Sequence, residues 1–229
     1  MAENSTATKP TREAASKGKA RELRMVEAAI EEFAERGFEG ATWRSIAERA
    51  GVSQGLIKFY FNDKEGLWQA ALMRAHDLLS EDLPPPPFTE GETLSLEKTA
   101  DWIRAYVHHA ARHPQYIKMT MREASAPNPR LAWAVQNLIR ESNKQFQDGI
   151  EELQKRGFFP NLNPVLVEYA FLGAIHHPFL ASEEIRAVYG MDILSNKMID
   201  AHCDTIIGLF LGNPLNPAAD DGAEKGRKR

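Results

Sequence analysis

Side chains that commonly carry out catalysis or bind metals are few in this sequence of 229 residues, and they are scattered along it. Cys203 is the only cysteine, so the sequence allows neither an intramolecular disulfide nor a multi-thiolate metal site. His109 and His113 have the i, i+4 spacing that two zinc ligands can share on a helix, but no third ligand is evident. We find no nucleophile accompanied by a base. We therefore expect no catalytic residue, no metal site and no cofactor, and we do not expect an enzyme.

The composition is typical of a globular protein, because hydrophobic residues make up 43% of it and can form a normal core. No apolar run approaches the length of a membrane span, and residues 1–20 lack the hydrophobic block of a secretory signal. The net charge of -4 argues against a protein that coats nucleic acid indiscriminately. We expect a cytoplasmic protein without a membrane partner, in which any contact with DNA depends on a few well-placed cations.

Residues 42–67 have the pattern of a helix-turn-helix. The apolar stripe of its first short helix consists of Ile46, Ala47 and Ala50. Gly51 can end this helix, and the Ser53 hydroxyl can accept a hydrogen bond from the first turn of the next one. Residues 54–59 are then predicted to form the recognition helix, which is too short to be stable without its neighbours.

An amphipathic helix is predicted on each side of this motif. Residues 20–36 carry apolar side chains at helical spacing, and Gly37 ends the run. Asn62 or Asp63 can cap a later helix that must end before the consecutive prolines 84–87. The first of these helices would complete a three-helix unit around the motif.

The rest of the chain is also predicted to be helical, and no strand pattern occurs. The helices expected here cover residues 95–113, 115–125, 128–156, 164–181 and 194–211. The predicted fold class is therefore all-α, with an N-terminal helix-turn-helix domain followed by a larger helical domain. The expected divisions are a disordered arm at 1–19, the first domain at 20–66, the second at 67–212 and a disordered tail at 213–229.

This layout resembles the TetR family of bacterial transcriptional regulators. The residues that carry the match are Thr42, Ile46, Ala47, Ala50, Gly51, Val52, Ser53, Gly55, Phe61, Lys64, Glu65 and Leu67. Beyond them the similarity is one of layout. The resemblance implies a sequence-specific DNA-binding regulator, a repressor that binds a palindromic operator as a homodimer and that a small-molecule effector releases.

The resemblance also assigns DNA contacts to particular residues. They are Thr42, Arg44, Ser53, Gln54, Gly55, Lys58, Tyr60 and Lys64. Gln54 can make paired hydrogen bonds to adenine, Lys58 can reach guanine or a phosphate, and Gly55 permits close approach of the helix backbone. The family usually has a tyrosine pair followed by a histidine where this chain has Lys58, Phe59 and Tyr60. Since Phe59 cannot donate a hydrogen bond to phosphate, we expect it to pack or to contact the groove.

A ligand pocket inside the second domain is a further implication of the resemblance. Candidate ligand-binding residues are Trp102, Tyr106, Tyr116, Met119, Thr120, Glu123, Trp133, Asn137, Phe171 and Ile175. Aromatic side chains at helical spacing are more often core than pocket, so an ordinary core is the alternative. Dimerisation is expected through residues 164–181 and 194–211, where His176 and His177 would pack at a helix bend or the dimer surface.

Two other classes of function stay open. One is a DNA-binding regulator that has no small-molecule site and is controlled by a protein partner. A fully packed second domain would favour it. The other is an all-helical enzyme, which would require a nucleophile with a base or a metal cluster.

Overall fold

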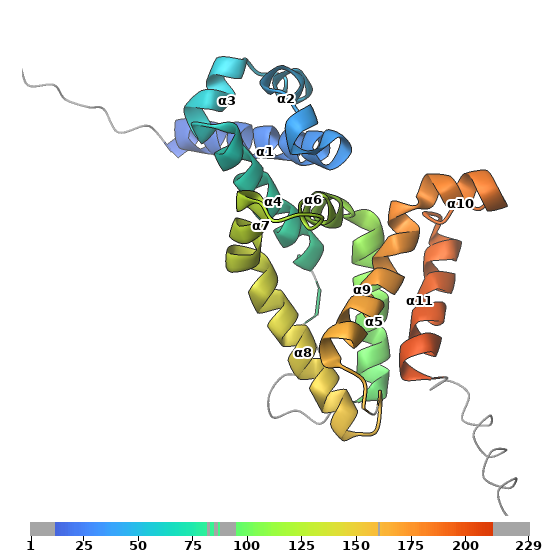
Figure 1. Ribbon diagram of the computed structural model, residues 1–229. Helices are drawn as coiled ribbons and strands as arrows, with labels where there is room; N and C mark the ends of the chain where they lie inside the picture. The colour runs from blue at the N-terminus through green and yellow to red at the C-terminus, as the bar shows by residue number, and fades with distance from the viewer. Residues whose placement is uncertain (1–11, 82, 85–86, 88–94, 160, 213–229) are drawn as a thin grey trace, which may run out of the picture. The chain divides into compact units, whose positions relative to one another are not determined.

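The computed structural model describes residues 12–81, 83–84, 87, 95–159 and 161–212. Over these residues the chain is helical and has no strand, so the predicted all-α class is confirmed (Figure 1). One compact unit ends at Ala75 and a second begins at His76. None of the described helices is both long and apolar enough to cross a membrane. The predicted disordered tail lies outside the described residues.

The first unit contains α1 (Arg12–Gly40), α2 (Trp43–Ala50), α3 (Gln54–Phe61) and most of α4 (Lys64–Ser80). Because α1 begins at Arg12, the last part of the predicted disordered arm is helical instead. Its alanine, lysine and glutamate residues favour a helix, which the apolar spacing alone did not reveal. Gly37, with φ 70° and ψ 175°, interrupts α1 close to its predicted end.

The core of this unit is formed by apolar side chains from all four helices. Those with almost no exposed surface include Met25, Phe33, Ile46, Ile57, Leu67, Trp68 and Leu72. α2 contacts both α1 and α3, so the short helices are supported by the longer one. Apolar burial of this kind provides the stability that two eight-residue helices lack on their own.

An ion pair joins α2 to α1. The Glu32 side chain on α1 is 3% exposed, and the Arg49 guanidinium on α2 lies 3.1 Å from its carboxylate. The same guanidinium lies 2.8 Å from the carboxylate of Glu35. Because a buried carboxylate is unfavourable without a partner, this contact fixes the orientation of α2 on α1.

The second unit contains the last turn of α4 and all later helices. These are α5 (Leu96–Arg112), α6 (Gln115–Glu123), α7 (Pro129–Ala134), a π-helical turn (Val135–Ile139), α8 (Arg140–Lys155), α9 (Pro164–Leu180), α10 (Ser182–Tyr189) and α11 (Asn196–Leu211). α5 contacts α9 and α11, and α8 contacts α9, an arrangement that Figure 1 shows.

Two features of the second unit differ from the predicted helices. The helix expected over 128–156 is divided by the π-helical turn, which shifts the faces of α7 and α8 relative to each other. α10 was not predicted. None of its side chains is buried, so it does not have the core-facing apolar stripe by which the other helices are predicted.

Candidate nucleic-acid interface and ligand cavity

The turn between α2 and α3 is fixed by local hydrogen bonds. Gly51 adopts the left-handed conformation with φ 66°, and its N–H is directed at the carbonyl groups of Ala47 and Glu48. The Ser53 hydroxyl accepts a hydrogen bond from the Leu56 N–H at 3.3 Å. These contacts end one helix and start the next, so α3 begins at Gln54, the residue predicted from the sequence.

The start of α2 is fixed by a reciprocal pair of hydrogen bonds. The Thr42 hydroxyl accepts from the Ser45 N–H at 3.0 Å, and the Ser45 hydroxyl accepts from the Thr42 N–H at 3.1 Å. Arg44 forms an exposed ion pair with Glu48 at 2.9 Å. Thr42 and Arg44 both remain exposed, so both are available to an anion that approaches the beginning of α2.

The outer face of α3 consists of residues that do not pack on the unit. Gln54, Gly55 and Lys58 are exposed, whereas Ile57 is fully buried and anchors the helix. Phe59 is 83% exposed and meets only the edge-on ring of Tyr60 among the aromatic contacts described, at 5.8 Å, so it is not part of the core and a groove contact stays its expected role. A Cβ at Gly55 would meet nothing within 4 Å, so the internal packing of the protein does not require glycine there.

The aromatic side chains near α3 lie beside two of the predicted DNA-contacting cations. The Lys58 ammonium lies 5.8 Å from the ring centre of Trp43, and the Lys64 ammonium lies 4.6 Å from that of Phe38. Such cation–π contacts restrict a flexible lysine without neutralising its charge. Tyr60 is half-buried, and its hydroxyl would lie 3.7 Å from a Cβ at Gly18 of α1.

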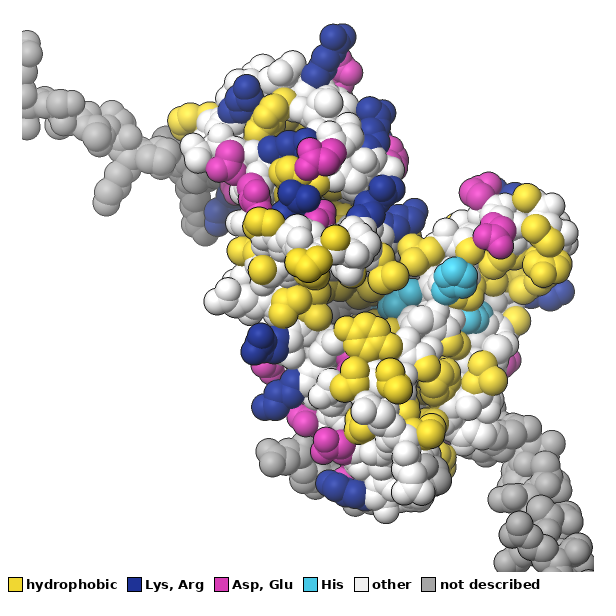
Figure 2. Space-filling model, viewed as in Figure 1, with side chains coloured by type: hydrophobic (Ala, Val, Ile, Leu, Met, Phe, Trp, Pro, Cys, Tyr) yellow, Lys and Arg dark blue, Asp and Glu magenta, His cyan; other side chains and the backbone are white. Residues whose placement is uncertain are grey.

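The second unit contains a cavity of about 850 Å³. Four of the predicted ligand-binding residues line it, namely Trp102, Tyr106, Tyr116 and Thr120. A volume of this size is sufficient for a drug-sized molecule. Figure 2 shows histidine side chains beside hydrophobic ones on the visible face of the molecule, and three histidines belong to the cavity lining.

The other predicted ligand-binding residues do not line this cavity. Met119 and Ile175 are fully buried in the core. Glu123 forms an ion pair with Arg130 at 3.1 Å, which accounts for its burial. The Asn137 amide donates to the Trp133 carbonyl oxygen at 2.8 Å, within one turn of helix. Phe171 lines a different and much smaller cavity.

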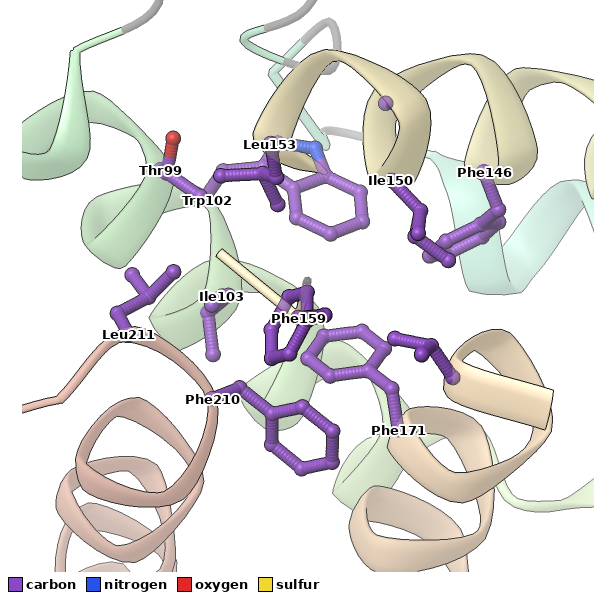
Figure 3. A pocket seen from close by; sticks show the side chains of 12 residues that line it. Thr99, Trp102, Ile103, Phe146, Ile150, Leu153, Phe159, Phe171, Phe210 and Leu211 are labelled. Carbon is purple, nitrogen blue, oxygen red and sulfur yellow. The ribbon is translucent and has the colours of Figure 1, made fainter. Parts of the chain in front are cut away.

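That smaller cavity, of about 40 Å³, is shown in Figure 3. Aromatic side chains surround it and point toward one another, among them Phe146, Phe159, Phe171 and Phe210. Its two polar groups have partners elsewhere: the Thr99 hydroxyl donates to the Ser95 carbonyl oxygen at 2.8 Å, and the Trp102 indole N–H donates to the Pro84 carbonyl oxygen at 3.1 Å. Space of this size in apolar surroundings is a packing gap rather than a ligand site.

Several lining residues of the large cavity were not among the predicted ones. They include His76, Ser142, Asn143, Phe146, Tyr169, His176 and His177. The imidazole of His76, from the end of α4, lies 3.3 Å from the Ser142 hydroxyl on α8. These residues come from helices far apart in the sequence, so no local pattern identifies them as one site.

A hydrogen-bonded pair of neutral side chains lies in the cavity wall. The Tyr106 hydroxyl on α5 is 3.0 Å from Nε2 of His176 on α9. Burial lowers the pKa of His176 to about 4 and raises the pKa of Tyr116 to about 12. Burial likewise raises the pKa of Tyr106. At neutral pH, all three of these groups are uncharged.

The histidines with metal-ligand spacing lie next to each other on α5. The ring centres of His109 and His113 are 6.3 Å apart. In the part of the chain that the structure describes, no three histidine, cysteine, aspartate or glutamate residues form a group that could hold a metal ion.

Comparisons with protein families match two segments of the chain. Residues 25–71 match the bacterial regulatory proteins of the tetR family, and residues 93–179 match the tetracyclin repressor-like C-terminal domain. The HTH-type transcriptional regulators BetI of Burkholderia thailandensis and Burkholderia cenocepacia are each 36% identical to the chain over 52 residues. That stretch is 23% of this chain and only 27% of each of those proteins, about a quarter of their length.

Solved structures resemble most of the chain. A Clostridium perfringens protein named for regulation of fatty acid metabolism has a TM-score of 0.63 at 21% identity, covering 82% of this chain and 97% of its own. A TetR-like transcriptional regulator from Rhodococcus sp. RHA1 has a TM-score of 0.59 at 18% identity, covering 89% and 97%. At these identities the likeness establishes the fold alone.

Proposed function

Since the chain belongs to the tetR family of bacterial regulatory proteins and is a DNA-binding transcriptional regulator, we propose that it is a repressor released from DNA by a small molecule. In this proposal a homodimer binds a palindromic operator. The predicted contacts, Thr42, Arg44, Ser53, Gln54, Gly55, Lys58, Tyr60 and Lys64, lie in the first unit.

The observation that most directly supports DNA reading is the free outer face of α3. Gln54, Gly55 and Lys58 are exposed while Ile57 anchors the helix to the core. Glutamine and lysine side chains can hydrogen-bond to base edges in the major groove, and glycine lets the backbone approach closely. The exposed Phe59 ring adds an apolar surface that suits contact with a thymine methyl group.

Dimer formation is supported by apolar side chains that remain exposed on the last helices. Leu166 and Tyr169 on α9 are 69% and 60% exposed, and Leu209 on α11 is 68% exposed. Large exposed apolar side chains grouped on neighbouring helices favour a protein interface. A two-fold axis beside α9 and α11 would cover both helices in each copy and set the separation of the two recognition helices.

Control by a small molecule is supported by the cavity of about 850 Å³ in the second unit. A regulator controlled only by a protein partner would not need a space of this size in its second unit. The cavity is lined by side chains from α4, α5, α6, α8 and α9, so an occupant would contact several helices at once. Binding can shift their packing if the two arrangements have different affinity for the ligand.

Selection of bound sequences from random duplex DNA with the purified protein tests this function. We expect a palindrome whose half-sites are about one helical turn apart. Recovery of no consensus at moderate salt would refute operator binding. Recovery of a single unpaired half-site would retain DNA reading but refute the dimeric arrangement.

A further inference from the structure

The lining of the large cavity contains no lysine, arginine, aspartate or glutamate among the described residues. Apart from histidine and tyrosine, its polar members are Ser80, Thr120, Ser142, Asn143 and Gln145, all of them uncharged. A charged ligand transferred from water into such a site would lose its hydration without gaining a partner of opposite charge. The described lining therefore offers no lysine, arginine, aspartate or glutamate that could pair with an ion of either sign.

Aromatic rings provide much of the apolar wall. Trp102 and Tyr106 are stacked, with ring centres 5.2 Å apart and planes inclined by 9°. Phe146 meets Trp102 edge-on at 5.7 Å, and the His76 ring meets Tyr116 edge-on at 5.2 Å. Stacked and edge-on rings present flat faces and positive edges, which complement another flat ring.

These rings are held in place by contacts of their own. The Trp102 indole N–H donates to the Pro84 carbonyl oxygen at 3.1 Å, which fixes the orientation of the indole. Trp102 is 6% exposed, and the Phe146 ring lies 6.3 Å from that of Phe171 on α9, so both rings also contact other parts of the protein. A wall that is already ordered loses little conformational entropy when a ligand binds.

The most buried hydrogen-bonded pair in this wall is Tyr106 with His176. The Tyr106 hydroxyl and Nε2 of His176 are 3.0 Å apart, and His176 is 5% exposed. A neutral imidazole has one donor and one acceptor nitrogen, and a phenol can donate one hydrogen bond while accepting another. After bonding to each other, the phenol and the imidazole each keep one further hydrogen-bonding capacity.

We propose that the cavity binds an uncharged aromatic molecule with one polar group, which hydrogen-bonds to Tyr106 or His176. This inference rests on the proposed function, in which the cavity holds the effector, and it adds the chemical class of that effector. A cage of aromatic rings can also attract a quaternary ammonium ion. Among the described residues, the lining supplies no carboxylate to balance that charge, which favours the uncharged ligand.

Two matched pairs of probes test the charge. N-phenyl-1-naphthylamine is fluorescent and uncharged, and 8-anilinonaphthalene-1-sulfonate is the same ring system with one sulfonate. tert-Butylbenzene and phenyltrimethylammonium have the same shape, and only the second is a cation. We expect each uncharged member to bind the full-length protein at least about tenfold more tightly than its charged partner. A smaller or reversed preference in either pair, or no binding by any probe, would overturn the proposal.

Two matched substitutions test the location. Ala124 and Ala132 are both exposed in the second unit, but only Ala124 lines the cavity. Ala124→Trp should weaken binding of N-phenyl-1-naphthylamine at least about tenfold by filling the space, while Ala132→Trp should leave it unchanged. Equal effects of the two substitutions would show that the probe binds elsewhere, and the assignment would be wrong.

The hydrogen bond is tested with 1-naphthol and 1-methylnaphthalene as competitors, since they differ by a hydroxyl in place of a methyl group. The native protein should prefer the naphthol at least about fivefold, after correction for their different transfer from water. Tyr106→Phe or His176→Phe should reduce this preference. No preference in the native protein, or the same preference in both variants, would exclude this contact.

The same probes separate this inference from the proposed function. Probe binding is measured without DNA, and release of the selected duplex is measured separately by fluorescence anisotropy. If the uncharged probes bind in the cavity but the duplex stays bound, the proposed class of ligand is retained and the proposed release of DNA by a ligand is refuted. If a charged probe binds more tightly than its uncharged partner and releases the duplex, the proposed class of ligand is refuted and the proposed release of DNA by a ligand is retained.

Discussion

The Tyr106 hydroxyl lies 3.0 Å from Nε2 of His176, and this hydrogen bond joins α5 to α9 in the wall of the large cavity. The two rings also meet edge-on, with their centres 5.7 Å apart. Both groups are buried and neutral at physiological pH. The stability of the second unit should therefore depend on pH through the protonation of His176.

Acidification should destabilise the protein through His176. Burial, followed by the nearby His202, lowers the pKa of His176 from 6.5 to about 4 in the folded state. The unfolded chain thus binds the proton more readily than the folded protein. The contribution of neutral His176 to stability is therefore fully present above pH 6.5 and is lost as the pH falls toward 4. We expect a loss of about 3 kcal/mol, measured by urea unfolding across this range.

The matched variant for this pH effect is His176→Gln. A glutamine amide can replace Nε2 as the hydrogen-bonding partner of the Tyr106 hydroxyl but does not titrate. The variant should lose most of the pH dependence between 6.5 and 4. His202, whose pKa burial also lowers, should leave a smaller dependence of the same sign. An unaltered pH profile in the variant would assign the effect to other groups.

A Gly55→Ala substitution should separate DNA binding from folding. A Cβ at this position meets nothing within 4 Å, and alanine is favoured over glycine in a helix, so stability should rise by up to about 1 kcal/mol. Affinity for the selected operator should fall about tenfold, because the methyl group would lie on the exposed face of α3 that we propose approaches the DNA. Lys118→Ala on α6, an exposed position outside α9 and α11, is the control and should not change DNA affinity. Unchanged affinity in Gly55→Ala would remove α3 from the interface.

Loss of the buried carboxylate that orients α2 should destabilise the first unit. Glu32→Ala removes the buried partner of Arg49, and we expect the free energy of unfolding to fall by about 2 kcal/mol. The loss is no larger because Arg49 keeps its contact with Glu35. Glu35→Ala removes the exposed partner of Arg49 and should lower the free energy of unfolding by less than about 1 kcal/mol. Thermal unfolding of both variants decides the matter, and equal losses would contradict the role assigned to Glu32.

A Lys64→Ala variant should weaken binding to all DNA sequences alike. If the Lys64 ammonium contacts one phosphate, the slope of log affinity against log salt should become less steep by about one unit. Its contact with the Phe38 ring is also lost, so unfolding of the variant must be measured alongside. Lys118→Ala on α6 is the control, since this exposed lysine is remote in the sequence from the predicted DNA contacts and lies outside α9 and α11. The same slope in native protein and variant would exclude a phosphate contact at Lys64.

The helix-turn-helix could be predicted because its boundaries are encoded locally. Gly51 supplies the left-handed residue that ends α2, and Ser53 supplies the cap that starts α3. Each signal acts over three or four residues, so the sequence alone places α3 at the residue where it begins. The exposure of Phe59 does not follow from the sequence, because an aromatic ring on a short helix suits either the core or a groove.

The lining of the cavity could be predicted only in part, because it comes from helices that are far apart in the sequence. Tyr116 and Met119 both belong to the apolar pattern of α6, yet Tyr116 lines the cavity and Met119 fills the core. The π-helical turn at Val135–Ile139 brings two further residues to the cavity, and periodicity does not reveal such a turn. His76 and His176 meet the same space only after α4 and α9 have packed.

The most direct measurement of DNA reading by α3 compares native protein and Gln54→Ala on the selected operator and on duplexes with single base changes. The Gln54 side chain is exposed on the free face of α3, where it can pair with an adenine edge. We expect the variant to lose about 1 to 3 kcal/mol on the operator and to tolerate a change at one base pair in each half-site. An equal loss on every duplex would show that Gln54 does not read sequence and would contradict recognition through this helix.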